Sequence, residues 1–161
     1  MQLTFEDRSY LVTGGGSGIG KAVAAALAAA GADVLIVGRN AERLAAVAAE
    51  LGERVRHLPA DVTDEDSVIA AVEAAAGPHG RLHGVVHCAG GSETIGPITQ
   101  IDSQAWRRTV DLNVNGSMYV LKHAGRALVR GGGGSFVGIS SIAASNTHRW
   151  FGAYGPTKSA L

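Results

Sequence analysis

A tyrosine and a lysine near the end of the chain have the spacing of a reactive pair. Tyr154 and Lys158 are four residues apart at the expected start of a helix, so their side chains share one face. An ammonium group beside a phenol stabilises the phenolate, which lets the hydroxyl exchange a proton near neutral pH. A solvent-exposed pair on a helix surface is the alternative, and the rest of the sequence must decide between the two.

A glycine-rich turn lies between the first expected strand and the first expected helix. It reads Thr13-Gly14-Gly15-Gly16-Ser17-Gly18-Ile19-Gly20. Backbone N–H groups and a helix N-terminus approach a pyrophosphate closely only where side chains are absent, so this placement favours phosphate binding over a purely structural turn. The residues that we expect to contact a dinucleotide here are Gly14, Gly16, Ser17, Gly18, Ile19 and Gly20.

A nucleoside triphosphate P-loop is the main rival interpretation of this turn. Gly15, Gly20 and Lys21 satisfy most of that motif, but Ala22 occupies the position where a P-loop needs Ser or Thr to bind magnesium. The mismatch falls on the residue that carries the metal chemistry. The sequence therefore argues against a nucleoside triphosphatase.

Two polar residues that follow the second and third expected strands bear on the choice of cofactor. A dinucleotide fold that uses NAD usually places an acidic side chain after the second strand, where this chain has Gly38 and Arg39. A guanidinium can pair with a 2′-phosphate, so NADP is favoured, with a solvated loop arginine as the alternative. Asp61 is placed either to accept a hydrogen bond from an adenine amino group or to form a turn near Thr63.

Together these motifs resemble the classical short-chain dehydrogenase/reductase family. The residues that carry the resemblance are Thr13-Gly14-x3-Gly18-Ile19-Gly20, Asp61-Val62, Asn113, Ser141 and Tyr154-x3-Lys158. Ser141 precedes Tyr154 by thirteen residues, which is the family's usual interval. The resemblance extends over essentially the whole chain.

The resemblance implies hydride transfer between NADP(H) and the carbonyl or alcohol carbon of a ketone or 3-oxoacyl group. Tyr154 would exchange a proton with the substrate oxygen, and Ser141 would orient that oxygen. Lys158 would bind the nicotinamide ribose, and Asn113 would hold a water in the proton relay. The further cofactor contacts would come from Arg39, Asp61, Val62, Ala89, Gly90, Tyr154 and Lys158. NAD stays possible, and a homo-oligomer, tetramer or dimer, is expected.

The chain departs from the family's pattern after the fourth expected strand, where His87-Cys88-Ala89-Gly90 replaces Asn-Asn-Ala-Gly. Ala89 and Gly90 keep the small residues that let a cofactor lie close. We interpret His87 as a hydrogen-bonding scaffold residue and not as an acid or base. Cys88 is interpreted as a small buried apolar residue and not as a nucleophile.

The elements that must position these residues alternate between apolar strands and alanine-rich helices. Strands are expected over residues 9–12, 34–37, 55–58, 82–88 and 136–140, and helices over 18–30, 41–51, from a Thr63 capping box to 76, over 103–130 and from 154. Strands without polar alternation are buried on both faces, as in parallel sheets. This order predicts a doubly wound α/β sheet, the Rossmann fold, with Asp102 as the cap of the long helix.

Composition excludes several other functions. Fourteen basic and fourteen acidic residues cancel, which gives no support to a nucleic-acid or membrane partner. The longest apolar stretch, residues 22–30, is far shorter than the roughly 20 residues of a transmembrane helix. A single cysteine fits a reducing compartment, so we expect a cytoplasmic protein. The histidines lack metal-ligand spacing, so no metal site is expected.

The chain stops at Leu161, seven residues after Tyr154, whereas members of the family continue well beyond this point. We expect residues 1–161 to form one dinucleotide-binding domain, truncated after the start of the Tyr–Lys helix. The segments 92–100 and 143–152 are expected to line the substrate site. The sequence therefore indicates a part of a longer protein.

Two alternatives remain for the function. The extended branch of the same superfamily acts on nucleotide sugars, but it prefers a Gly-x-x-Gly-x-x-Gly turn, and the spacing of Gly14, Gly18 and Gly20 fits the classical branch better. A non-catalytic dinucleotide-binding protein or redox sensor is disfavoured by the retained Ser–Tyr–Lys set. We therefore expect an NAD(P)-dependent oxidoreductase that acts on a small molecule.

Overall fold

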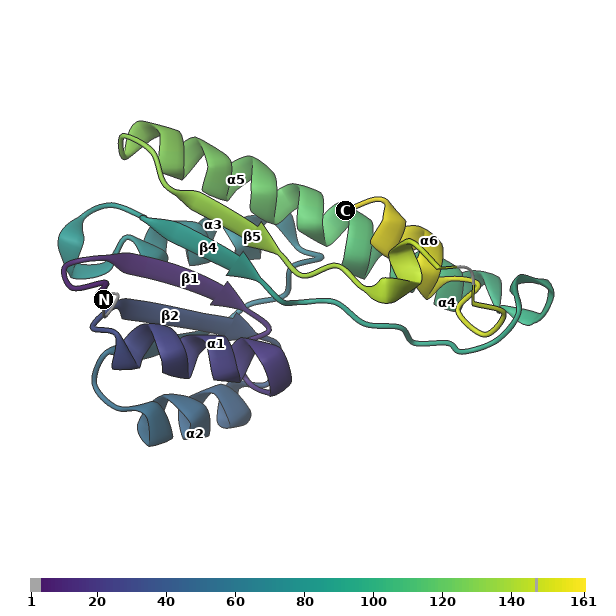
Figure 1. Ribbon diagram of the computed structural model, residues 1–161, viewed down its shortest axis with the longest axis horizontal. Coiled ribbons are helices and arrows are strands. Elements are labelled where there is room, and N and C mark those ends of the chain that lie inside the picture. The colour runs from purple at the N-terminus through teal and green to yellow at the C-terminus, as the bar shows by residue number, and fades with distance from the viewer. Residues whose placement is uncertain (1–3, 147) are drawn as a thin grey trace.

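The computed structural model describes residues 4–146 and 148–161, which contain a five-stranded parallel sheet (Figure 1). The strands lie in the order β3-β2-β1-β4-β5. They are β1 (Ser9–Thr13), β2 (Asp33–Gly38), β3 (Val55–Pro59), β4 (Gly84–His87) and β5 (Ser135–Gly138). The order reverses between β1 and β4, and the crevice beyond their carboxyl ends is where such sheets bind ligands. The expected doubly wound parallel sheet is confirmed.

Helices cover both faces of this sheet. They are α1 (Gly18–Ala29), α2 (Ala41–Leu51), α3 (Glu65–Ala75), α4 (Ser103–Val110), α5 (Gly116–Arg130) and α6 (Tyr154–Ser159). In Figure 1, α1 and α2 cover one face, α3 and α5 cover the other, and α4 and α6 lie beyond the arrowheads of the strands. Within the described residues, no helix is long and apolar enough to cross a membrane.

The inner strands β1 and β2 have uninterrupted apolar runs, residues 10–12 and 34–37, because each of their faces meets a layer of helices. Leu11 and Leu35 pack in a cluster with residues of α3 and α5. Their neighbours Val12 and Ile36 pack in a second cluster with residues of α1 and α2. Successive side chains of a strand point to opposite faces, so an uninterrupted apolar run fills both cores.

The edge strands correct the expectation that every strand is buried on both faces. Residues of β3 after Val55 are partly buried or exposed, and three of the four residues of β5 are exposed. Each has a neighbouring strand on one side only. The fourth strand is also shorter than expected: it spans Gly84–His87 and not residues 82–88.

The helix expected over residues 103–130 is interrupted, which is a second correction. A π-helical turn, Asp111–Asn115, separates α4 from α5. It coincides with Asn113, whose buried side chain bonds to Gly91, and with Gly116, where a Cβ would lie 3.0 Å from the Val62 side chain. A π-helical turn is a single wider turn inside a helix, and here it contains the buried Asn113. Helical periodicity cannot reveal such a turn.

The two expected helix caps have different outcomes. Asp102 Oδ1 accepts hydrogen bonds from the backbone N of Gln104 at 3.0 Å and of Ala105 at 2.9 Å, so its cap of α4 is confirmed. The capping box at Thr63 is wrong, since α3 begins after Asp64 and the Thr63 hydroxyl instead donates to Asp61 Oδ1 at 2.8 Å. The Asp61 carboxylate accepts from both the backbone N and the hydroxyl of Thr63, so Thr63 belongs to the turn that precedes the helix.

Replacement of the α4 cap tests this local account. Asp102→Ala removes the acceptor for two backbone N–H groups, so we expect it to lower the free energy of unfolding by about 1 kcal/mol. Asp102→Asn keeps a side-chain oxygen and serves as the matched control, with little loss expected. Urea denaturation followed by circular dichroism measures both values, and an equal loss in the two variants would contradict the cap.

Candidate functional site

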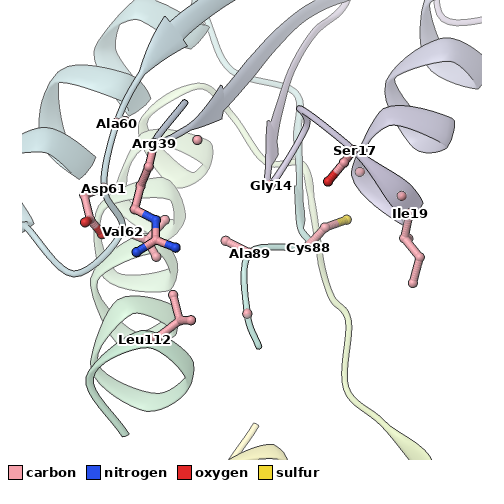
Figure 2. Close-up of a pocket in the computed structure, with 14 residues that line it drawn as sticks. Gly14, Ser17, Ile19, Arg39, Ala60, Asp61, Val62, Cys88, Ala89 and Leu112 are labelled. Carbon is pink, nitrogen blue, oxygen red and sulfur yellow. The ribbon is translucent and has the colours of Figure 1, made fainter. Parts of the chain in front are cut away.

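A pocket of about 330 Å³ opens beyond the carboxyl ends of the strands, between the glycine turn and the residues that follow β3 and β4 (Figure 2). It includes most of the residues expected to bind a dinucleotide. Its lining is Gly14, Ser17, Gly18, Ile19, Gly20, Gly38, Arg39, Ala60, Asp61, Val62, Cys88, Ala89, Gly90 and Leu112. Gly16, Tyr154 and Lys158 lie outside this lining, and a Cβ on Gly16 would lie 3.5 Å from the side chains of Arg43 and Leu44.

The glycines of the turn allow close backbone packing. Gly14 has a φ of +68°, and a Cβ on it would lie 3.0 Å from the backbone N of Ala89. A Cβ on Gly20 would lie 2.3 Å from the carbonyl oxygen of Gly14. Side chains at these positions would therefore separate the turn from β4 and from α1. The glycines are required by the fold of the turn itself as well as by space for a ligand.

The N-terminus of α1 points its free backbone N–H groups toward this pocket. Ser17 occupies the N-cap position, and its side chain makes no capping hydrogen bond within the described residues. The first turn of α1 contains no acidic residue that would compete with an anion. Unpaired N–H groups and the positive end of the helix dipole suit a pyrophosphate, so this part of the pocket fits a dinucleotide.

Arg39 and Asp61 lie on the opposite side of the pocket, in the loops after β2 and β3. Figure 2 shows the Arg39 side chain directed into the pocket beside Val62. Asp61 lines the pocket and also holds a turn, because its Oδ1 accepts from the backbone N of Thr63 at 3.0 Å and from its hydroxyl at 2.8 Å. The turn that was one of the two expectations for Asp61 is therefore present.

Asn113 and Lys158 converge beneath Gly90. A Cβ on Gly90 would lie 2.9 Å from both Asn113 Oδ1 and Lys158 Nζ. Asn113 Oδ1 accepts from the backbone N of Gly91 at 3.0 Å, and its Nδ2 donates to Gly91 O at 2.7 Å and to Thr157 Oγ1 at 3.0 Å. Gly90 lines the pocket, and its lack of a side chain lets Asn113 and Lys158 lie directly behind it.

Lys158 is buried although it carries an ammonium group. Its side chain is 5% exposed, and Nζ donates to the carbonyl oxygen of Ile139 at 2.9 Å. Burial lowers the pKa of Lys158 from its ordinary value. An ammonium has three donors, so one bond to Ile139 leaves two for ligand hydroxyls.

Tyr154 and Ser141 lie on neighbouring segments next to Lys158. Lys158 Nζ is 5.9 Å from the centroid of the Tyr154 ring, and the Phe151 ring packs edge-on against Tyr154 at 5.7 Å. Ser141 Oγ accepts from the backbone N of Ala143 at 3.2 Å. Among the described residues, the Ser141 and Tyr154 hydroxyls are not hydrogen-bonded to each other. Either hydroxyl can therefore turn toward a substrate oxygen.

His87 and Cys88 occupy the positions where the sequence departs from the family's pattern. His87 is buried, and its ring nitrogens bond to the hydroxyls of Thr13 and Ser117 at 2.7 and 2.9 Å. Burial and the positive charge of Lys158 together lower the pKa of His87 to about 4. Such a neutral imidazole agrees with a scaffold role.

Cys88 packs against the core cluster beneath α1 and α2, as expected, but it is not fully buried. It lines the pocket and presents its sulfur beside the glycine turn (Figure 2). The parallel strand ends at His87, so the next residue leaves the sheet and meets the crevice. Burial raises the pKa of the thiol, which agrees with the expectation that Cys88 is not a nucleophile.

Leu112, Ala60 and Gly38 also line the pocket, although none of them was predicted to contact a cofactor. Leu112 reaches the pocket from the π-helical turn, so helical periodicity contains no signal for it. Gly38 ends β2, and Ala60 directly follows β3. Small residues at the carboxyl ends of parallel strands are a sequence signal that could have predicted both as pocket residues.

The two segments expected to line the substrate site meet in a second pocket of about 560 Å³. Backbone N–H groups join them, from Gly96 to Trp150 O at 2.7 Å and from Gly152 to Gly96 O at 3.2 Å. Residues 97 and 98 line the pocket with much of 143–152, together with Trp106 of α4 and parts of α6. Thr147 lies outside the described residues. No group of three His, Cys, Asp or Glu side chains in the described ranges could hold a metal ion.

The comparisons with known proteins agree with this arrangement. The family model for short chain dehydrogenases matches residues 8–161. The chain is similar to cis-4-hydroxycyclohexanecarboxylate dehydrogenase of Sinomonas cyclohexanicum, with 40% identity over 140 residues that cover 86% of this chain and 56% of that protein.

Two solved structures extend the comparison. A short-chain type dehydrogenase/reductase from Mycobacterium ulcerans has 72% identity and a TM-score of 0.95, covering 98% of this chain and 60% of that one. NAD+-bound xylitol dehydrogenase has 30% identity and a TM-score of 0.92, covering 97% of this chain and 61% of that one. The chain thus spans a little over half the length of these proteins. By its family match and these likenesses, it belongs to the short chain dehydrogenase family of oxidoreductases.

Proposed function

We propose that this chain is the dinucleotide-binding domain of an oxidoreductase that transfers hydride between NADP(H) and a carbonyl or alcohol carbon, as in a ketone or 3-oxoacyl group. The observation that supports this most strongly is the convergence of Lys158 and Asn113 beneath Gly90, at the end of the pocket that begins at the glycine turn. The bound nicotinamide supplies the hydride acceptor or donor. NAD is the alternative cofactor.

The chain's own residues divide into binding and proton transfer. The turn from Gly14 to Gly20 and the N-terminus of α1 hold the pyrophosphate, and Asp61 and Val62 border the adenine. Ala89 and Gly90 lie along the cofactor, and Lys158 offers its two remaining protons to the ribose hydroxyls. A close fit here excludes water and orients the ring toward the substrate.

Proton transfer falls to the residues next to Lys158. The Tyr154 hydroxyl gives a proton to the substrate oxygen in reduction and takes it back in oxidation. The Ser141 hydroxyl donates a hydrogen bond to the same oxygen and so fixes its direction. Asn113 holds a water that passes the proton onward, while Lys158 keeps positive charge close to the phenol.

The setting of the enzyme forms part of the proposal. A small molecule is the substrate, and the lone Cys88 favours the reducing environment of the cytoplasm. We further propose a homo-oligomer, either a tetramer or a dimer. The exposed apolar side chains of Met118, Leu121 and Val129 on α5 support such an assembly, because large apolar patches mark contact surfaces.

Substitution of the proposed proton donor tests catalysis. Tyr154→Phe removes only the hydroxyl, so we expect turnover to fall by about 10²- to 10⁴-fold while the affinity for the dinucleotide is kept. NADPH absorbance with a panel of ketones measures turnover, and protein fluorescence titration measures affinity. Tyr10→Phe, a hydroxyl deletion beside Phe5 and away from the pocket, is the matched control.

Full turnover in Tyr154→Phe would exclude the proposed mechanism. Tight dinucleotide binding by the unaltered protein with no turnover on any ketone or alcohol would instead favour a non-catalytic dinucleotide-binding protein.

Substitution of Arg39 tests the choice of cofactor. Charge-assisted hydrogen bonds to a 2′-phosphate contribute about 1.5–3 kcal/mol, so Arg39→Ala should weaken NADPH binding by about 10- to 100-fold. NADH lacks this phosphate and should bind with unchanged affinity. Isothermal titration of both cofactors measures the difference, with Arg130→Ala at the far end of α5 as the control. Equal affinities of the unaltered protein for NADPH and NADH would remove the proposed role of Arg39.

A further inference from the structure

His87 joins three elements that are distant in the sequence. It ends β4 and is 2% exposed. Its Nδ1 lies 2.7 Å from the hydroxyl of Thr13 at the end of β1, and its Nε2 lies 2.9 Å from the hydroxyl of Ser117 on α5. The imidazole therefore connects the ends of β1 and β4 to α5, next to the candidate site.

The neighbouring hydrogen bonds determine which atom is the donor in each of the two bonds of the His87 ring. Ser117 Oγ donates to the carbonyl oxygen of Asn113 at 2.5 Å, so its proton is committed and it accepts from His87 Nε2–H. Since the pKa of His87 is about 4, the ring is neutral at pH 7 and Nδ1 carries no proton. Thr13 Oγ1, which accepts from the backbone N of Ala89 at 3.0 Å, therefore donates to Nδ1.

This chain of hydrogen bonds ends on the π-helical turn. The carbonyl that Ser117 engages belongs to Asn113, the residue whose side chain holds Gly91. The same side chain donates to Thr157 Oγ1, and Thr157 in turn donates to the carbonyl oxygen of Tyr154 at 2.8 Å. A displacement of Asn113 would therefore also displace the loop that follows β4 and the helix α6.

We propose that His87, as a neutral Nε2–H imidazole, is a positioning residue that acts through Ser117 to hold the π-helical turn in place. It thereby sets Asn113 against Gly91 and against the helix of Tyr154 and Lys158. The inference rests on the proposed function in so far as those residues carry the reaction. His87 itself takes no part in proton transfer, because both of its nitrogens are occupied within the network.

A double-substitution cycle tests whether His87 acts through Ser117. His87→Leu and Ser117→Ala should each lower kcat by about 100-fold, because a misplacement of about 1 Å in an active site has an effect of that size. The doubly substituted protein should show no further loss, since the two residues act along one path. The complete natural protein is used, and kcat is normalised to the folded fraction.

Rescue and control variants separate positioning from general destabilisation. His87→Gln places an amide N–H near the former Nε2, so it should restore the bond to Ser117 and most of kcat. His57→Gln, an exposed histidine on β3, should leave kcat unchanged. Additive losses in the cycle, or an unchanged kcat in folded His87→Leu, would overturn the proposal.

Two measurements on the protein do not depend on turnover. Nitrogen-15 NMR should show the His87 ring protonated at Nε2 and bare at Nδ1 from about pH 5 to about pH 8, whereas an ordinary histidine titrates near 6.5. Lys158 is the titratable group whose charge acts on the ring. Amide hydrogen exchange of residues 113–116 should be faster in His87→Leu than in the unaltered protein.

These readouts distinguish the two proposals. A protonated Nδ1, a ring that titrates near 6.5 or unchanged exchange in His87→Leu would overturn the role of His87 alone. The expected tautomer and faster exchange in a protein with no turnover would support that role and remove the proposed function.

Discussion

The close approach of the glycine turn to the end of β4 is the constraint on which the rest of the site depends. A Cβ on Gly14 would lie 3.0 Å from the backbone N of Ala89, and the Thr13 hydroxyl accepts a hydrogen bond from the same N–H group. Backbone thus packs on backbone at the point where the strand order reverses. Together with the pairing of β1 and β4, this contact places the N-terminus of α1 and the loop after β4 around one pocket.

Around that contact the protein buries several polar side chains, each with a hydrogen-bond partner. Thr13, His87, Asn113, Ser117, Thr157 and Lys158 are all buried. Among the described residues, no buried side-chain nitrogen or oxygen lacks a hydrogen bond. In a low-dielectric interior an unpaired group would be costly, so each bond restricts the others. The same burial keeps His87 neutral and lowers the pKa of Lys158.

Local sequence signals predicted much of the fold. Helix α2 has the expected bounds Ala41–Leu51, because Asn40 caps it and Gly52, with a φ of +91°, ends it. The apolar runs of β1 and β2 predicted burial on both faces. The capping box at Thr63 and the uninterrupted helix over residues 103–130 were wrong. In both places a local preference lost to a contact, with Asp61 in the first case and with Gly91 in the second.

The sequence by itself determined the residue types of the site and their order along the chain, since the glycine turn, Ser141 and the Tyr154–Lys158 pair are local patterns. The tertiary structure alone decided how those residues meet. His87 and Ser117 are 30 residues apart and Asn113 and Thr157 are 44 apart, yet each pair shares a hydrogen bond. Such bonds depend on how the sheet and helices pack, and packing distances leave no periodic trace in a single sequence.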